Sequence, residues 1–332
     1  MKIVKTKAYA RAALLGNPSD GYFGRTIAIS VKNFSAEVVL YEWPELEIVL
    51  SRQDRCLFDS LDQLVEDVKL NGLYGGLRLI KAAIKRFAEY CLRSGIRLPH
   101  QNFSLRYDTT IPRQVGLAGS SAIITAVYRA LMQFYRVEVP REILPNLILE
   151  VENREIGIQA GLQDRVVQTY EGLVYMDFER AHMEAHGHGR YEPLDPGVLP
   201  PLYLAYRSDL SEISGIVHSN LRARWDRGDM DVILAIRTLA DITEQGRECL
   251  QKKDWRTFSE LMDRNFDIRA GILTLDPRNV EMVRLARSLG VCANYAGSGG
   301  SIVGICPEEG LLQRMQQEFA KIGCRVIQPQ VQ

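Results

Sequence analysis

The stretch at residues 112–122, Pro-Arg-Gln-Val-Gly-Leu-Ala-Gly-Ser-Ser-Ala, constrains the fold more than any other part of the chain. Upstream, residues 102–108 alternate apolar and polar side chains, which predicts a half-buried strand. Downstream, apolar side chains recur with helical spacing at Ile123, Val127, Ala130, Leu131 and Phe134. The stretch therefore joins a strand to an amphipathic helix.

The glycines and serines of this stretch suit an anion site. A helix N-terminus leaves backbone N–H groups without partners and bears a partial positive charge. Gly116 and Gly119 have no side chains that would keep an anion from these donors. We expect Ser120 or Ser121 to be the helix N-cap. Alone, the stretch is equally compatible with an ordinary capped turn.

Length and charge limit the class of protein. At 332 residues, two domains are expected. The 41 basic and 41 acidic residues balance, which argues against nucleic acid or an anionic membrane as a partner. No apolar run is long enough to span a bilayer. The cysteines form no Cys-x-x-Cys pair, so we expect a cytoplasmic protein without structural disulfides.

Periodicity divides the chain near its middle. Strands are predicted at residues 2–15, 26–40, 45–50, 102–108 and 173–178, and helices at 74–91, 123–134, 145–155 and from 161 onward. The polar, Gly- and Pro-rich segment 179–200 is predicted to be a linker that separates domains 1–195 and 196–332. Its histidines, His182, His186 and His188, have metal-ligand spacing but are interpreted as part of a solvated loop.

The second half of the chain predicts an α+β sandwich with a four-stranded sheet. Its strands are expected at residues 202–206, in two pieces within 291–306, and at 324–331. Its helices are expected at 230–250, 254–272, 280–289 and 310–322. Gly290 is placed just after the third of these helices, where glycine is the preferred C′ residue.

Three glycine-rich segments, at residues 15–24, 116–121 and 297–301, are each expected to follow a strand. The chain has neither a Gly-x-x-x-x-Gly-Lys-Ser/Thr loop nor a Gly-x-Gly-x-x-Gly that opens a βαβ unit. In order and content the three segments resemble the motifs of the GHMP kinases, and the resemblance covers essentially the whole chain. Residues 15–27, 74–78, 102–108, 111–123, 160–167 and 261–267 further resemble the plant-type glucuronokinases.

The resemblance implies a two-domain α+β fold. The N-terminal α/β domain would have helices packed over its sheet, and the C-terminal domain would be a ferredoxin-like α+β sandwich. It implies phosphoryl transfer from ATP to the anomeric hydroxyl of D-glucuronate, with Mg²⁺. The implied nucleotide-binding residues are Pro112, Gly116, Leu117, Ala118, Gly119, Ser120, Ser121, Ala122, Gly297, Ser298, Gly299 and Gly300.

The resemblance also implies roles for individual side chains. Asp164 would be the general base or the group that orients the sugar hydroxyl, and Arg11 would pair with it. Ser121 and Glu152 would hold Mg²⁺, with Glu155 as the alternative glutamate. Family spacing falls on Asn153, so Glu152 requires a one-residue insertion.

Recognition of a sugar acid also needs a cation for its carboxylate, and arginine suits it. Arg25, Arg113 and Arg165 are the candidates, and the sequence does not rank them. Asn17, Asp20 and Tyr22 are placed where the family contacts the sugar. The expected partners are therefore a sugar acid and ATP, in a monomer or homodimer. The alternatives are a kinase of another sugar or uronic acid, and a catalytically silent sugar and ATP sensor.

Overall fold

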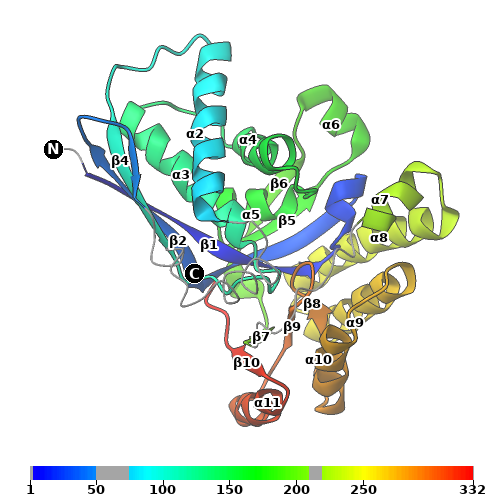
Figure 1. The fold of residues 1–332 in the computed structure, drawn as a ribbon. Helices are drawn as coiled ribbons and strands as arrows, with labels where there is room; N and C mark the ends of the chain where they lie inside the picture. The colour runs from blue at the N-terminus through cyan, green and yellow to red at the C-terminus, as the bar shows by residue number, and fades with distance from the viewer. Residues whose placement is uncertain (1–2, 50–74, 209–218, 332) are drawn as a thin grey trace, which may run out of the picture.

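The computed structural model describes residues 3–49, 75–208 and 219–331 (Figure 1). Leu50, at the end of a predicted strand, Cys56, and Tyr74, at the start of a predicted helix, fall outside these residues. Within the described ranges, no helix has the length and apolar character needed to cross a membrane.

A long antiparallel hairpin organises the first sheet. Strand β1 (Ile3–Leu15) pairs with β2 (Arg25–Glu42) along its whole length. On its other edge, β2 pairs first with β5 (Leu173–Asp177) and then with β4 (Phe103–Thr109). The short strand β3 (Glu47–Val49) extends the sheet beyond β4. The predicted strands of this half are confirmed.

The burial of β1 changes along its length. Its first residues alternate between exposed and buried, as in a strand with one solvated face. From Ala10 to Leu15 every side chain is buried. Helices α3 (Gly119–Tyr135) and α9 (Trp255–Ile272) both contact β1, and Figure 1 shows them on opposite faces of the sheet. Arg11 therefore projects from a strand that protein covers on both sides.

Helices from the first half of the chain cover one face of this sheet (Figure 1). They are α2 (Gly76–Arg93), α3, α4 (Leu144–Glu150) and α5 (Gln163–Tyr170). A π-helical turn, η3 (Val151–Ile156), continues from α4. A π-turn holds more residues than an α-turn, and π-bulges are concentrated at functional sites. The turn contains Glu152, where the sequence required one additional residue.

The predicted linker at residues 179–200 is wrong as a description of structure. It contains α6 (Arg180–His186), strand β6 (Arg190–Leu194) and a 3₁₀ turn (Pro196–Val198). Strand β6 pairs with β5 and belongs to the first sheet. Polar composition concealed β6 because an edge strand needs few apolar side chains. The domain boundary near residue 195 stays a prediction.

The second sheet is antiparallel and has four strands, as expected. They are β7 (Leu202–Arg207), β8 (Asn294–Tyr295), β9 (Ser301–Ile305) and β10 (Cys324–Ile327), in the order β10-β7-β9-β8. This is the fourth-first-third-second order of a ferredoxin-like sandwich. The accompanying helices are α7 (Ser219–Asp226), α8 (Met230–Lys252), α9, α10 (Pro277–Ser288) and α11 (Glu309–Lys321).

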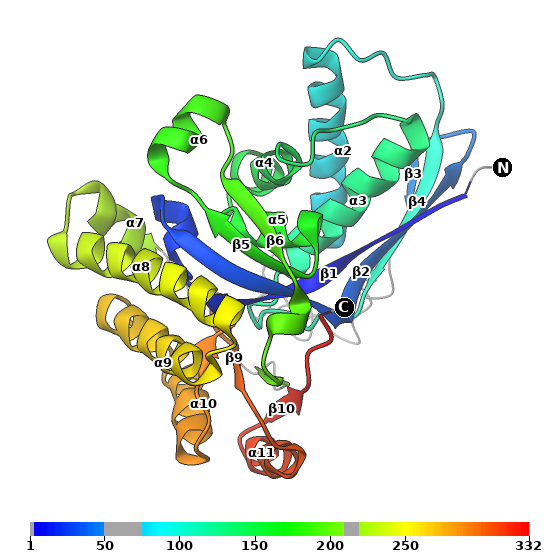
Figure 2. The same cartoon turned by 180° about the vertical axis from the view of Figure 1, so that it is seen from behind.

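Helices α8 and α9 connect the two sheets, as Figure 2 shows from behind. Buried side chains of β1, such as Leu14 and Leu15, share one apolar cluster with Leu239 of α8 and Phe258 of α9. The two halves of the chain thus have a continuous core at the base of the glycine-rich segments. Among the α-helices of the described residues, α6 and α7 have no counterpart in the prediction.

Candidate active site

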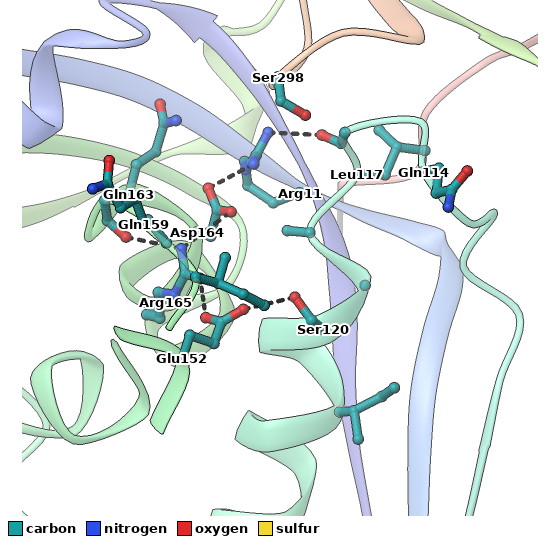
Figure 3. Close-up of a pocket in the computed structure, with 18 of the residues that line it drawn as sticks. Arg11, Gln114, Leu117, Ser120, Glu152, Gln159, Gln163, Asp164, Arg165 and Ser298 are labelled. Carbon is teal, nitrogen blue, oxygen red and sulfur yellow. Dashed lines mark hydrogen bonds and ion pairs between the residues drawn. The ribbon is translucent and has the colours of Figure 1, made fainter. Parts of the chain in front are cut away.

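A cavity of about 870 Å³ lies where the three glycine-rich segments meet (Figure 3). Its lining includes Pro112, Gly116 to Ser120, Gly297 and Ser298 among the predicted nucleotide-binding residues. Asn17, Asp20, Tyr22, Asp164 and Arg165 line it as well. The structure therefore brings the predicted phosphate, sugar and catalytic residues together around one space.

The second glycine-rich segment enters α3 through an unusual backbone. Gln114, Gly116 and Ala118 all have positive φ, at 58°, 70° and 62°. Helix α3 begins at Gly119, so its N-cap is Ala118 and not Ser120 or Ser121 as predicted. A left-handed alanine costs on the order of 1 kcal/mol. This backbone leaves the first N–H groups of a 17-residue helix beside the cavity.

The second and third glycine-rich segments touch through their main chains, and we call this contact, between residues 114–118 and 296–300, the loop contact. A Cβ on Gly297 would lie 1.9 Å from the Gly116 carbonyl oxygen. A Cβ on Gly300 would lie 2.8 Å from Val115 Cα. The Ser301 hydroxyl also donates to the Val115 carbonyl oxygen at 2.6 Å. Glycine is required here because two backbones approach too closely for side chains.

A buried arginine holds the third segment from behind. Arg269, from α9, donates through Nη1 to the Gly297 carbonyl at 2.8 Å and through Nη2 to the Ser298 carbonyl at 3.3 Å. Burial lowers its pKa to about 10. Its side chain also lies over the Tyr295 ring, at 5.0 Å from the centroid. We did not predict Arg269, since nothing in its spacing separates it from the other polar residues of a helix.

Three acids and two arginines form the other side of the cavity, and we call Asp20, Glu152, Asp164, Arg11 and Arg165 the carboxylate cluster. Arg11 Nη2 lies 2.6 Å from Asp164 Oδ1, and Arg165 Nη1 lies 3.3 Å from Asp164 Oδ2. Arg165 also forms a buried ion pair with Glu152. Burial opposes the charge of Arg165, but Glu152 and Asp164 raise its pKa. Figure 3 shows Asp164 between the two arginines.

Asp20 is the unusual acid of the cluster. Burial raises its pKa to about 6, and the nearby Asp164 carboxylate adds to the rise. Its Oδ2 accepts a hydrogen bond from the Gln163 backbone N–H at 3.1 Å. Gly161 makes room for it, because a Cβ there would lie 2.0 Å from the same oxygen. The first glycine-rich segment and residues 161–163 therefore pack together around the Asp20 carboxyl group.

The serine beside Glu152 differs from the prediction. Ser120 Oγ donates to Glu152 Oε1 at 2.6 Å, and both residues line the cavity. The Ser121 side chain is fully buried, and its hydroxyl donates to the Ala118 carbonyl at 3.2 Å. With Ala118 as N-cap, α3 starts two or three residues earlier than a cap at Ser120 or Ser121 would place it, and Ser121 lies buried in the first turn. Ser120, and not Ser121, therefore has its hydroxyl beside Glu152, while the metal pair itself stays a prediction.

The two candidate glutamates have different surroundings. Glu152 faces the cavity, whereas Glu155 lies 2.7 Å from Lys85 Nζ of α2. Two oxygens, from Ser120 and Glu152, suit Mg²⁺, which usually keeps several waters and takes one or two protein ligands. Among the described residues, no group of three or more His, Cys, Asp or Glu side chains could hold a metal ion.

Arg11 joins the loop contact to the carboxylate cluster. While Nη2 pairs with Asp164, Nη1 donates to the carbonyl oxygens of Gly116, at 3.3 Å, and Ala296. Figure 3 shows the guanidinium between Asp164 and the loop that contains Leu117. Its placement follows from β1, whose second half runs beneath both glycine-rich segments. The predicted pairing of Arg11 with Asp164 is present in the structure.

Several predicted residues do not line the cavity. Arg25 is directed toward Asp177, at 3.3 Å, and Glu244, at 3.8 Å. The structure therefore gives Arg25 acidic partners outside the cavity, and it is no longer a candidate for the substrate carboxylate. Ala122, Gly299 and Gly300 lie behind the lining, and the last two shape the loop contact. Asn17 lines the cavity, and its side-chain amide donates to the Gly297 carbonyl at 3.1 Å.

The family models for the N-terminal and C-terminal domains of GHMP kinases match residues 78–172 and 247–323. A probable glucuronokinase 2 of Arabidopsis thaliana is 44% identical over 98% of this chain and 91% of its own length. The chain belongs to the GHMP kinases. Glucuronokinase 1 of the same plant is also 44% identical, over 96% of this chain and 90% of its own length.

Solved GHMP kinases share the fold. The mevalonate kinase of Methanococcus jannaschii has a TM-score of 0.73 at 19% identity, covering 100% of this chain and 98% of the other. The Lactococcus lactis galactokinase complexed with galactose has a TM-score of 0.76 at 16% identity, covering 99% and 94%. Both confirm the two-domain α+β fold that the glycine-rich segments implied.

Proposed function

We propose that this GHMP kinase is a glucuronokinase, which transfers the γ-phosphoryl group of ATP to the anomeric hydroxyl of D-glucuronate. The observation that carries the proposal is the Arg11–Asp164 ion pair, at 2.6 Å, between the loop contact and the predicted sugar residues. The 44% identity to two Arabidopsis glucuronokinases supports glucuronate as the substrate.

Phosphoryl transfer requires mainly positioning and neutralisation of charge, because its transition state spreads negative charge over the γ-phosphoryl oxygens. The N–H groups at the start of α3 and the Gly297–Ser298 backbone would hold the phosphates. Arg11 adds a positive charge where the transferring group would pass toward the sugar. The residues on this side of the cavity thus supply the electrostatic part of the reaction.

Asp164 would act on the sugar hydroxyl. As the hydroxyl oxygen bonds to the γ-phosphorus and the bond to ADP breaks, the hydroxyl proton passes to the Asp164 carboxylate or is oriented by it. Arg11 and Arg165 hold both oxygens of this carboxylate, which fixes its direction. Ser120 and Glu152 would hold Mg²⁺, which neutralises phosphate charge when bound. ATP use follows from the family, and the metal is part of this proposal.

The test is ADP release from the purified protein with ATP and Mg²⁺, comparing D-glucuronate, D-galacturonate, D-galactose and D-glucose. Phosphorus NMR of the product would locate the phosphate. We expect strong preference for glucuronate and a phosphate on the anomeric carbon. Turnover of another sugar would replace the substrate and keep the mechanism. Binding of glucuronate and ATP without turnover would instead support a sensor and overturn the proposal.

A further inference from the structure

The cavity has four arginines among the described residues that line it, and a sugar acid would bring one carboxylate to them. They are Arg11, Arg113, Arg165 and Arg222. Arginine suits this task because the two parallel N–H groups of its guanidinium match both oxygens of a carboxylate. The arginine that binds a sugar acid must combine unused N–H groups with a position on the sugar side of the cavity.

Arg11 and Arg165 use their donors within the protein. Arg11 pairs with Asp164 and donates to two loop carbonyls. Arg165 pairs with Glu152 and Asp164 and donates to the Gly161 carbonyl at 2.8 Å. Both side chains are almost completely buried. A substrate carboxylate would have to displace an existing acid to reach either guanidinium.

Arg113 and Arg222 differ in where they stand. Arg113 follows Pro112 at the entrance to the second glycine-rich segment, on the phosphate side. The Arg222 guanidinium carbon lies 6.0 Å from the centroid of the Tyr22 ring, and Tyr22 follows Asp20 on the 3₁₀ turn η1 (Ser19–Tyr22). Figures 1 and 2 both show α7 beside this blue segment after β1. Arg222 is therefore on the sugar side.

The residues between Asp164 and Arg222 form a path across the sugar side. Asp20 is close enough to Asp164 for their charges to interact, and Tyr22 interacts in the same way with Asp20 and Arg222. Trp225 of α7 packs on Tyr22, with ring centroids 5.3 Å apart. In a uronate, the anomeric hydroxyl and the carboxylate project from opposite sides of the ring oxygen. A sugar with its hydroxyl at Asp164 would direct its carboxylate away from the carboxylate cluster.

We infer that Arg222 is the specificity-determining residue that binds the substrate carboxylate, through Nη1 and Nη2, with the Tyr22 ring beneath its guanidinium. Asp226 accepts only from Nε, at 3.1 Å to each carboxylate oxygen, and so orients the side chain while both Nη groups stay unpaired within the described chain. Arg222 is otherwise exposed, so the two Nη groups are accessible from the cavity. This inference rests on the proposed function.

The test is steady-state kinetics of Arg222→Met with D-glucuronate and with the best neutral sugar. Two charged hydrogen bonds would be lost, so we expect the KM for glucuronate to rise about 10- to 100-fold. The KM for ATP and kcat/KM for the neutral sugar should stay within about twofold, since neither ligand would use Arg222. Arg222→Lys should recover part of the loss, because a lysine keeps the charge without the fork.

Two further variants complete the experiment. Arg227→Met, an exposed arginine of the same segment outside the cavity lining, should match the parent protein. Arg113→Met should leave the KM for glucuronate unchanged. An unchanged KM in Arg222→Met, or a rise in Arg113→Met alone, would overturn the inference while the parent still phosphorylates glucuronate. A parent without glucuronate turnover would instead overturn the proposed function.

Discussion

One side of the cavity is formed by main-chain atoms and the other by charged side chains. The loop contact consists of main-chain atoms, and it exists because Gly116, Gly297 and Gly300 have no Cβ atoms. The carboxylate cluster consists of side chains whose charges hold one another in place. A phosphate group looks alike in every nucleotide, so backbone N–H groups can serve it. A sugar must be distinguished from other sugars, and this requires side chains.

The difference predicts different sensitivities. Substitutions that add volume should disrupt the backbone contacts, and their effect should not depend on pH. Substitutions that remove a charge should disrupt the carboxylate cluster. Arg11 belongs to both sides, since it pairs with Asp164 and donates to the Gly116 and Ala296 carbonyls. The following experiments separate the two sides, beginning with the largest expected effect.

Asp164→Asn should break the carboxylate cluster without touching the loop contact. Asparagine cannot accept the hydroxyl proton, so kcat should fall by about 10² to 10⁴. ATP affinity, measured by calorimetry, should change little, because Asp164 makes its described contacts with Arg11 and Arg165 and not with the phosphate side. An equal loss of ATP affinity would show that the two sides are not separable.

Gly297→Ala should damage chiefly the loop contact, although its Cβ would also lie 2.9 Å from Arg11 Nη1. Its Cβ would lie 1.9 Å from the Gly116 carbonyl oxygen, so the two segments must move apart. Denaturant unfolding should show a loss of about 1–3 kcal/mol, and kcat/KM for ATP should fall about 10-fold or more. Gly271→Ala is the matched control, since a Cβ there meets nothing within 4 Å. Unchanged ATP kinetics in Gly297→Ala would remove the loop contact from nucleotide binding.

Asp20→Asn should make the contrast visible as a pH dependence. The pKa of Asp20 is raised from 3.8 to about 6, chiefly by burial, so the folded protein binds its proton more tightly than the unfolded chain. Stability contributed by this proton is present below about pH 4 and is lost as pH rises through about 6. The asparagine keeps the neutral form at every pH.

The Asp20→Asn protein should therefore be more stable than the parent at pH 7, by on the order of 1–2 kcal/mol, and this advantage should disappear below about pH 4. Thermal unfolding across pH 3.5–8 measures it. Gly297→Ala should show a loss that does not vary over the same range. A difference in stability that does not vary with pH would mean that burial does not raise the pKa of the Asp20 carboxyl group.

The smallest effect separates the neighbouring serines. Ser120→Ala removes the hydroxyl beside Glu152, and we expect the Mg²⁺ concentration for half-maximal rate to rise about fivefold. Ser121→Ala removes a hydroxyl that donates to a main-chain carbonyl, and should cost only about 0.5–1 kcal/mol of stability, with Mg²⁺ dependence unchanged. The reverse result would restore Ser121 to the metal pair.

The same contrast explains what the sequence could predict. Glycine at a main-chain contact has few substitutes, so the three glycine-rich segments predicted the phosphate side and its place in the fold. The roles of Asp164 and Arg11 lie outside these segments and were implied by the resemblance to the GHMP kinases. Strand β6 was not predicted because an edge strand has little apolar pattern. Helix α7 was not predicted because its eight residues are mostly polar.

Side-chain partners could not be predicted in the same way. Arg25 and Arg222 look alike in sequence, but one pairs with Asp177 and the other reaches the cavity beside Tyr22. The choice between Ser120 and Ser121 depended on the left-handed backbone of Ala118, which alanine rarely adopts. Such features arise from tertiary packing, and local sequence contains no signal for them.

The burial of β1 has a practical consequence for how this protein can be produced. Residues 10–15 are covered on one face by helices of the first half of the chain and on the other by helices of the second. A chain cut anywhere between β6 and β7 would leave this apolar strand half uncovered in the N-terminal piece. We expect that piece to aggregate when expressed alone, and to become soluble only when both pieces are synthesised together.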